Sequence, residues 1–140
     1  MQWRAGPGAG FTTGRPWLRL APDADRRNAA VEAADPDSVY SAYRRLLAFR
    51  VQAEALRTGA MERLETGDPD VLAWTRTGGD QELLVVVSFV GEERRIGLAG
   101  LGAGRWTARV GTHREPSAVG DDGFVLLRPD EAVIFEAADA

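Results

Sequence analysis

The chain has 140 residues, enough for one domain of ordinary size and short of two. It has no cysteine, which excludes disulfides and thiolate metal sites and favours a reducing cytoplasmic compartment. Its formal net charge of -4 argues against a nucleic-acid partner, and the lack of a run of about 18 apolar residues argues against a membrane-spanning helix.

The first 34 residues are rich in glycine and proline and show neither a helical nor a strand period. Yet they carry large apolar side chains of a kind that disordered tails lack: Trp3, Phe11, Trp17, Leu18 and Leu20. A structureless loop of this length is unusual inside a compact domain. We therefore expect these side chains to pack against something outside the chain, which would make the chain an incomplete piece of a larger protein.

One helix is predicted over about residues 36–54, with Asp35 as its N-cap and Pro36 at its first position. At about 100° per residue, one face of this helix is apolar and carries Val39, Tyr43, Leu46, Leu47 and Val51. Arg50 lies among these side chains, and a buried guanidinium needs a partner. We expect a structural ion pair, with Glu54 as one partner, rather than a contact with a substrate anion.

Residues from about 60 to 136 have the pattern of β structure. Turn signals of Gly, Asp and Pro separate predicted strands at 61–64, 71–77, 83–89, 94–98, 105–110, 124–128 and 132–135. Short strands at this spacing favour an antiparallel sandwich-like sheet. The strand from Leu83 to Val87 is apolar on both sides, which predicts a central position with both faces covered. The stretch from Arg105 to Arg109 alternates, which predicts one face in water.

The residue types that usually carry catalysis or bind metals form no recognisable site. His113 is the only histidine, and Ser117 lacks the surroundings of a nucleophile elbow. The acids at 68–70 and 121–122 lack the ligand spacing of an EF-hand and suit β-turns. Residues 6–10 resemble a phosphate loop only in their glycines, because no Gly-Lys-Ser/Thr follows them. We expect no metal and no cofactor.

Tryptophan side chains give the one indication of ligand binding, because an exposed indole ring can stack on a sugar. Trp74 and Trp106 fall in predicted strands, where core or interface positions are expected. Trp3 and Trp17 fall in the glycine-rich segment, which cannot bury them by itself. They are therefore the candidate substrate-binding residues of this chain.

Five stretches, in order, resemble one family. Met1-Gln2-Trp3 and Gly8-Ala9-Gly10-Phe11-Thr12-Thr13-Gly14-Arg15-Pro16-Trp17 resemble the stretch after the eighth barrel strand of α-glucosidases in the α-amylase superfamily (glycoside hydrolase family 13), in the oligo-1,6-glucosidase and trehalose synthase branches. Residues 35–47 resemble the last barrel helix, and residues 83–89 and 127–135 resemble the C-terminal β domain. Arg4 is a departure, because the residue after Gln-Trp is usually acidic in that family.

The resemblance implies cleavage or transfer of α-glucosidic bonds by a parent enzyme whose three catalytic carboxylates come from barrel strands upstream. No catalytic residue is assigned in this chain. Residues 1–57 would be the end of a (β/α)8 barrel, a loop plus its final helix, and residues 58–140 a C-terminal antiparallel β domain. The expected fold class is mostly β, and the expected partners are the barrel and α-glucosides, with self-association through exposed apolar surface and no nucleic acid or membrane.

Two other functions remain open. The chain could be a free-standing carbohydrate-binding β module that uses Trp3 or Trp17 as its platform. It could also be an interaction module whose partner is a separately encoded barrel chain.

Overall fold

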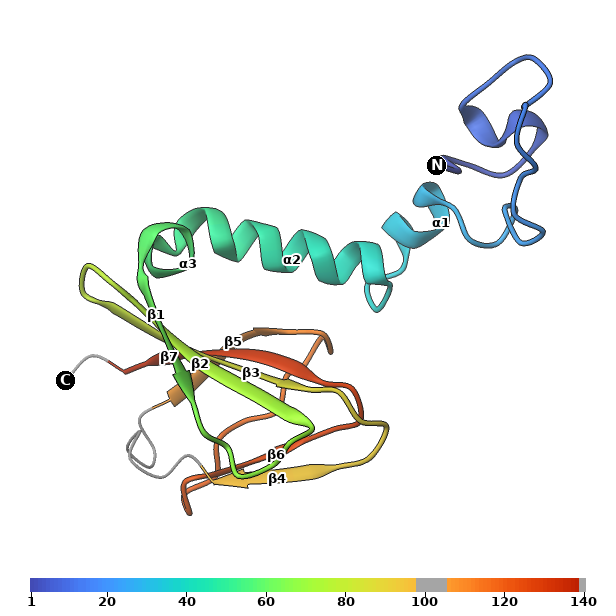
Figure 1. Ribbon diagram of the computed structural model, residues 1–140. Helices are drawn as coiled ribbons and strands as arrows, with labels where there is room; N and C mark the ends of the chain where they lie inside the picture. The colour runs from blue at the N-terminus through green and yellow to red at the C-terminus, as the bar shows by residue number, and fades with distance from the viewer. Residues whose placement is uncertain (98–105, 139–140) are drawn as a thin grey trace. The chain divides into compact units, whose positions relative to one another are not determined.

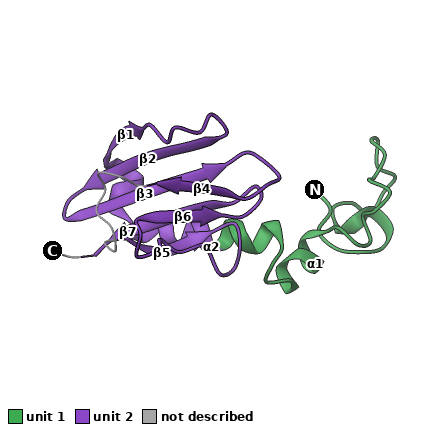
Figure 2. Ribbon diagram, turned by 90° about the horizontal axis from the view of Figure 1, so that it is seen from below, with its two compact units in different colours: residues 1–44 green, residues 45–140 purple. Residues whose placement is uncertain are grey.

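A computed structural model describes residues 1–97 and 106–138 of the chain (Figure 1). Its contacts divide the protein into two compact units, Met1–Arg44 and Arg45–Ala140 (Figure 2). The division falls inside the longest helix, α2 (Val39–Gln52). The first unit is largely irregular, and the second contains the described β strands.

The N-terminal unit is folded on itself although its sequence has little periodicity. It contains a 3-10 turn, η1 (Pro7–Gly10), and a six-residue helix, α1 (Ala29–Ala34), which the sequence pattern did not indicate. Asn28 is 4% exposed and caps α1, because its side chain accepts a hydrogen bond from the Val31 amide at 3.1 Å. The amides of Ala29 and Ala30 donate to the carbonyl groups of Gln2 and Trp3, which fixes the start of the chain against the start of α1.

The predicted helix is present but differs at both ends. Asp35 is not its N-cap, because Asp35 ends α1, and the Ser38 hydroxyl accepts the capping hydrogen bond from the Ser41 amide at 3.1 Å. Helix α2 stops at Gln52, since Ala53 has an extended backbone with φ -87° and ψ 104°. A separate short helix, α3 (Glu54–Thr58), then begins. The break lets α3 turn back onto strands β2 and β3.

The second unit is antiparallel, as predicted. Strands β1 (Ala60–Leu64), β2 (Val71–Gly78), β3 (Gln81–Ser88), β7 (Ala132–Ala137) and β5 (Trp106–Gly111) form one sheet in the spatial order β1-β2-β3-β7-β5. Strands β4 (Arg94–Gly97) and β6 (Phe124–Leu127) form a second layer (Figure 1). Leu98, Arg105 and the turn predicted at 102–104 lie outside the described residues.

The core lies on both faces of the large sheet, and β3 contributes to both. Leu84 and Val86 pack with the second sheet through residues such as Val125, whereas Leu83 and Val85 pack with α3 through Ala55 and Leu56. This confirms the prediction of a central strand with both faces covered, because period-2 alternation sends apolar side chains to each layer.

Strand β5 changes face along its length. Thr107 and Arg109 are exposed while Trp106 is buried, which agrees with the predicted wet face. A register shift between Ala108 and Val110 then inserts one residue relative to β7. Because a bulge breaks the alternation, Trp106 belongs to the cluster under the second sheet and Val110 to the cluster under α3.

Candidate functional site

The tight turn after Trp3 is built on glycine geometry. The amides of Trp3 and Arg4 both donate to the Ala9 carbonyl, at 2.9 and 3.3 Å. Gly6, Gly8 and Gly10 have φ angles of 101°, 66° and 76°, a region that side chains disfavour. Ala9, at φ 47°, shares that region and is 1% exposed. The glycine run that the sequence presents is therefore a means of bending the chain sharply.

An open hollow of about 680 Å³ lies beside this turn, within the N-terminal unit. Its lining residues include Arg4, Phe11, Thr12 and Thr13, and none of its lining residues is acidic. Arg4 lies directly against Gly10: a Cβ added at Gly10 would come 2.8 Å from the Arg4 Cγ and 3.2 Å from its Nε. The missing side chain at Gly10 thus makes the space that Arg4 occupies.

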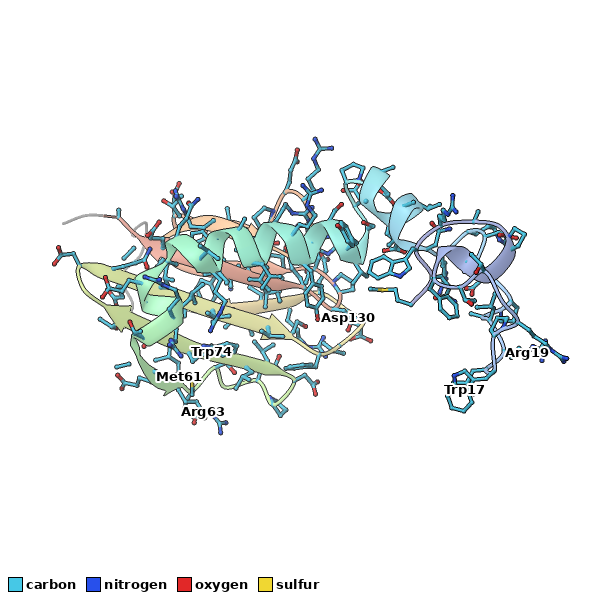
Figure 3. The ribbon with its side chains drawn as sticks, turned by 90° about the horizontal axis from the view of Figure 1, so that it is seen from above. Trp17, Arg19, Met61, Arg63, Trp74 and Asp130 are labelled. Atoms are coloured by element: carbon cyan, nitrogen blue, oxygen red, sulfur yellow. The ribbon has the colours of Figure 1, made fainter. Side chains whose placement is uncertain are left out.

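The two tryptophans named from the sequence do not line this hollow. Trp3 is 52% exposed and lies next to it, with its Cβ 3.3 Å from where a Gly10 Cβ would be. Trp17 is 92% exposed and points away from its own segment (Figure 3). Their role in binding stays a prediction. Sequence reasoning overlooked the hollow, because the glycines were considered only as a phosphate loop.

The apolar face predicted for α2 is present and uncovered in the part of the chain that the structure describes. Each of its members is more than one third exposed: Val39 68%, Tyr43 62%, Leu46 38%, Leu47 55% and Val51 69%. Phe49, in contrast, packs against the cluster formed by α3 and the sheet. A helix with an unpartnered apolar stripe of this size is typical of a surface that another element covers.

The structure corrects the predicted burial of Arg50 and its predicted ion pair with Glu54. The Arg50 side chain is exposed, and its Nη1 donates to the Leu56 carbonyl at 2.7 Å in place of the expected pair with Glu54. A main-chain acceptor satisfies the guanidinium, so Arg50 links the end of α2 to α3. The structural role that was expected holds, whereas the partner differs.

Glu131 is the one fully buried carboxylate among the described residues. It accepts hydrogen bonds from the Ser117 amide and hydroxyl at 2.9 and 2.6 Å, and from the Arg128 amide, Nε and Nη2 at 2.8, 3.3 and 2.7 Å. Burial by itself would raise the pKa of Glu131, but these hydrogen bonds favour the charged form and lower that pKa to about 2. Glu131 therefore stays ionised and joins the β6–β7 turn to the loop that carries Ser117.

This cluster does not form a catalytic triad. The Ser117 hydroxyl is bonded to Glu131, and His113 is exposed on the same loop. Among the described residues no hydrogen bond joins His113 to Ser117, so the structure does not assemble the nucleophile and base that acyl transfer requires. Ser117 and Glu131 hold the fold together.

The acid pairs that suit turns make turn contacts. Asp68 accepts from the Asp70 amide, and Asp122 from the Phe124 amide. Each pair also faces an arginine: Asp68 and Asp70 lie 3.3 and 3.5 Å from Arg94, and Asp122 lies 2.7 Å from Arg95. In residues 1–97 and 106–138 no group of three His, Cys, Asp or Glu side chains could hold a metal ion. Within the same ranges, no helix is long and apolar enough to cross a membrane.

Together, a two-layer antiparallel β domain, a preceding helix with an uncovered apolar stripe and a folded glycine-rich segment define a class: an accessory β domain joined to the end of a larger fold. Comparison with known proteins identifies that fold. Residues 1–59 match the family model for the α-amylase catalytic domain.

Relatives match through most of the chain. Trehalose-6-phosphate hydrolase of Bacillus subtilis is 31% identical over 136 residues, which is 96% of this chain and 24% of that protein. The probable oligo-1,6-glucosidase 2 of the same organism is 38% identical over 66% of this chain and 17% of its own length. The trehalulose synthase MutB of Pseudomonas mesoacidophila MX-45 superimposes with a TM-score of 0.84 and 35% identity, over 98% of this chain and 24% of that one.

The chain belongs to the α-amylase superfamily, as its motifs indicated, and resembles the C-terminal portion of its α-glucosidases. It spans about a quarter of the length of the relatives that match nearly all of it.

Proposed function

We propose that this chain is the closing part of a larger α-glucosidase-like glycoside hydrolase, in which it packs against a (β/α)8 barrel and is not catalytic alone. The observation that carries the proposal is the apolar stripe of α2, which is exposed in this chain. The family match at residues 1–59 supports it, because the matched model is that of a catalytic domain and covers all of α2.

Burial of the α2 stripe against another element would be energetically favourable. Fully burying one Val, Leu or aromatic side chain contributes roughly 1.5–3 kcal/mol. Five side chains that are each partly exposed would together contribute on the order of 5 kcal/mol when covered. If the stripe stayed exposed to water, this burial free energy would not be gained, and the exposed apolar side chains would favour self-association of the chain. We include such self-association of the separate chain in the proposal.

The proposed substrates of the whole protein are α-glucosides in the cytoplasm. Its relatives include enzymes for both neutral and charged glucosides: an oligo-1,6-glucosidase and a trehalose-6-phosphate hydrolase. A trehalulose synthase relative is known in complex with the substrate sucrose. The absence of cysteine in this chain is the support for a cytoplasmic location.

Co-expression tests the proposal. The 140-residue chain is produced together with a barrel-only protein from the same source, and the mixture is run on a size-exclusion column. We expect a complex of one chain with one barrel, with loss of the chain's self-association. Two proteins that elute independently would contradict the proposal, including its version with a separately encoded barrel.

A carbohydrate-binding module is the second candidate, and the 92% exposure of Trp17 is the observation that favours it. Titration of the chain with maltose and isomaltose, followed by tryptophan fluorescence, separates the two. Saturable quenching that Trp17→Ala abolishes would support the module. An unchanged spectrum would leave the barrel-packing function as the better explanation.

A further inference from the structure

The hollow beside Gly10 has the chemistry of a site for an anion. Arg4 is the one charged side chain that lines it, and no acidic side chain does. Among the described residues no ion pair or hydrogen bond occupies the Arg4 guanidinium. Asp25, an acid of the same unit, accepts a hydrogen bond from the Gly6 amide at 2.9 Å. The positive charge of Arg4 is therefore available to a ligand.

The other lining groups suit a sugar. Phe11 is 47% exposed at the hollow and offers an aromatic face on which a pyranose ring can stack. Thr13 adds a hydroxyl, and the Thr12 hydroxyl already accepts from the Gly14 amide at 3.1 Å, so its own proton remains free to donate. A cation, an apolar ring and hydroxyl donors thus surround one volume of about 680 Å³.

We propose that this hollow is a subsite for a phosphorylated sugar, with the phosphate on Arg4 and the ring on Phe11. Guanidinium groups bind phosphate through two parallel hydrogen bonds, which gives both charge and orientation. The inference goes beyond the proposed function: it adds a site for a sugar phosphate to the N-terminal unit and leaves the proposed α-glucoside substrates of the whole protein unchanged.

The mode of recognition differs from that of a phosphate loop. Two backbone amides of the turn are already engaged: Ala9 donates to the Gly6 carbonyl, and Phe11 to the Gly8 carbonyl. Neither amide is free to bind an anion. Side chains carry the proposed contact, and Gly10 positions Arg4 by leaving room for it, since a Cβ there would come within 2.8 Å of Arg4 Cγ.

Titration of the 140-residue chain, followed by the backbone amide signals of residues 8–14 in NMR spectra, tests the site. Glucose 6-phosphate, glucose and inorganic phosphate are the probes. We expect glucose 6-phosphate to shift these signals saturably and to bind at least about tenfold more tightly than either glucose or phosphate, because it alone engages both Arg4 and Phe11. Raised salt should weaken the binding of glucose 6-phosphate and not that of glucose.

Two matched variants test whether Arg4 binds the phosphate. Arg4→Gln should lower the affinity for glucose 6-phosphate at least about tenfold and leave that for glucose unchanged. Arg19→Gln removes an exposed charge from the same segment and should change neither. Equal affinities for glucose and glucose 6-phosphate, equal binding of free phosphate, or an Arg4→Gln variant that binds normally would each overturn the subsite. Because association with the barrel is measured in a separate experiment, the proposed function can be supported even when the titration contradicts the sugar-phosphate site.

Discussion

Glu131 shows how much one residue contributes to the β domain. Its carboxylate is buried and accepts hydrogen bonds from two neighbours, Ser117 and Arg128, which come from different turns. We predict that Glu131→Gln lowers the free energy of unfolding by about 1–3 kcal/mol, because the neutral side chain weakens the charge-assisted hydrogen bonds from Ser117 and Arg128 at a buried position. Urea denaturation measures the loss.

The matched control is Glu65→Gln, whose side chain is 87% exposed and lies 3.8 Å from Arg63. Exposed pairs of this kind contribute about 0–1 kcal/mol. If both variants lost the same small amount, the buried cluster would have no special part in stability.

The same residue predicts an acid dependence. The pKa of Glu131 is lowered to about 2 in the folded chain, below its value of 4.5 in the unfolded one. The unfolded state therefore binds more protons in between, and the stabilisation present above about pH 4.5 is lost as the pH falls toward about 2. Unfolding free energies measured from pH 6 down to pH 3 should decline more steeply for the native chain than for Glu131→Gln. Parallel curves would refute the assignment.

At the scale of elements, the junction between α3 and β1 is packed too closely for any side chain. A Cβ at Gly59 would lie 2.5 Å from the Ala55 carbonyl oxygen and 2.6 Å from that of Thr77. Both obstacles are backbone atoms, which cannot rotate away. Gly59→Ala should therefore reduce stability by about 1–3 kcal/mol in a thermal or urea unfolding experiment.

Gly91→Ala is the comparison for that variant, because the nearest atom to its Cβ would be 4.0 Å away, on Asp130. It should be neutral within about 0.5 kcal/mol. Equal effects of the two substitutions would show that glycine content in general, and not the junction, sets the loss.

The exposed stripe of α2 gives a prediction that separates folding from docking. Leu47 is 55% exposed, so Leu47→Glu should leave the melting temperature of the chain nearly unchanged while it weakens association with the barrel. Ala48→Glu places the same charge on the opposite, polar face and should leave association intact. Size-exclusion chromatography of each variant mixed with the barrel measures this association. If both variants lost association equally, or neither lost it, the stripe would not be the interface.

The elements show what a sequence can predict here. The strands were predicted closely because Gly, Asp and Pro mark the turns and because β3 is apolar on both sides. The break at Ala53 was missed, since alanine favours helix and only the packing of α3 on the sheet requires an extended residue there. The bulge in β5 was missed for a similar reason: a register shift depends on the partner strand.

At the scale of the whole molecule, the sequence predicted more apolar surface than the chain can cover. The exposed stripe of α2 and the exposed Trp3 and Trp17 of the first segment agree with that prediction. The hollow at Arg4 was not predictable in that way. It depends on left-handed backbone angles at Gly6, Gly8 and Gly10, which periodicity does not report, and on Arg4 lying against Gly10.

The proposal that this chain completes a catalytic barrel is tested most directly by turnover of p-nitrophenyl α-glucoside. The assay compares the pure chain, a barrel-only protein from the same source, and the two co-expressed. We predict no turnover by the chain and at least about tenfold more turnover by the complex than by the barrel alone, because a docked α2 stripe stabilises the barrel. Turnover by the pure chain, or a barrel whose activity the chain leaves unchanged, would contradict it.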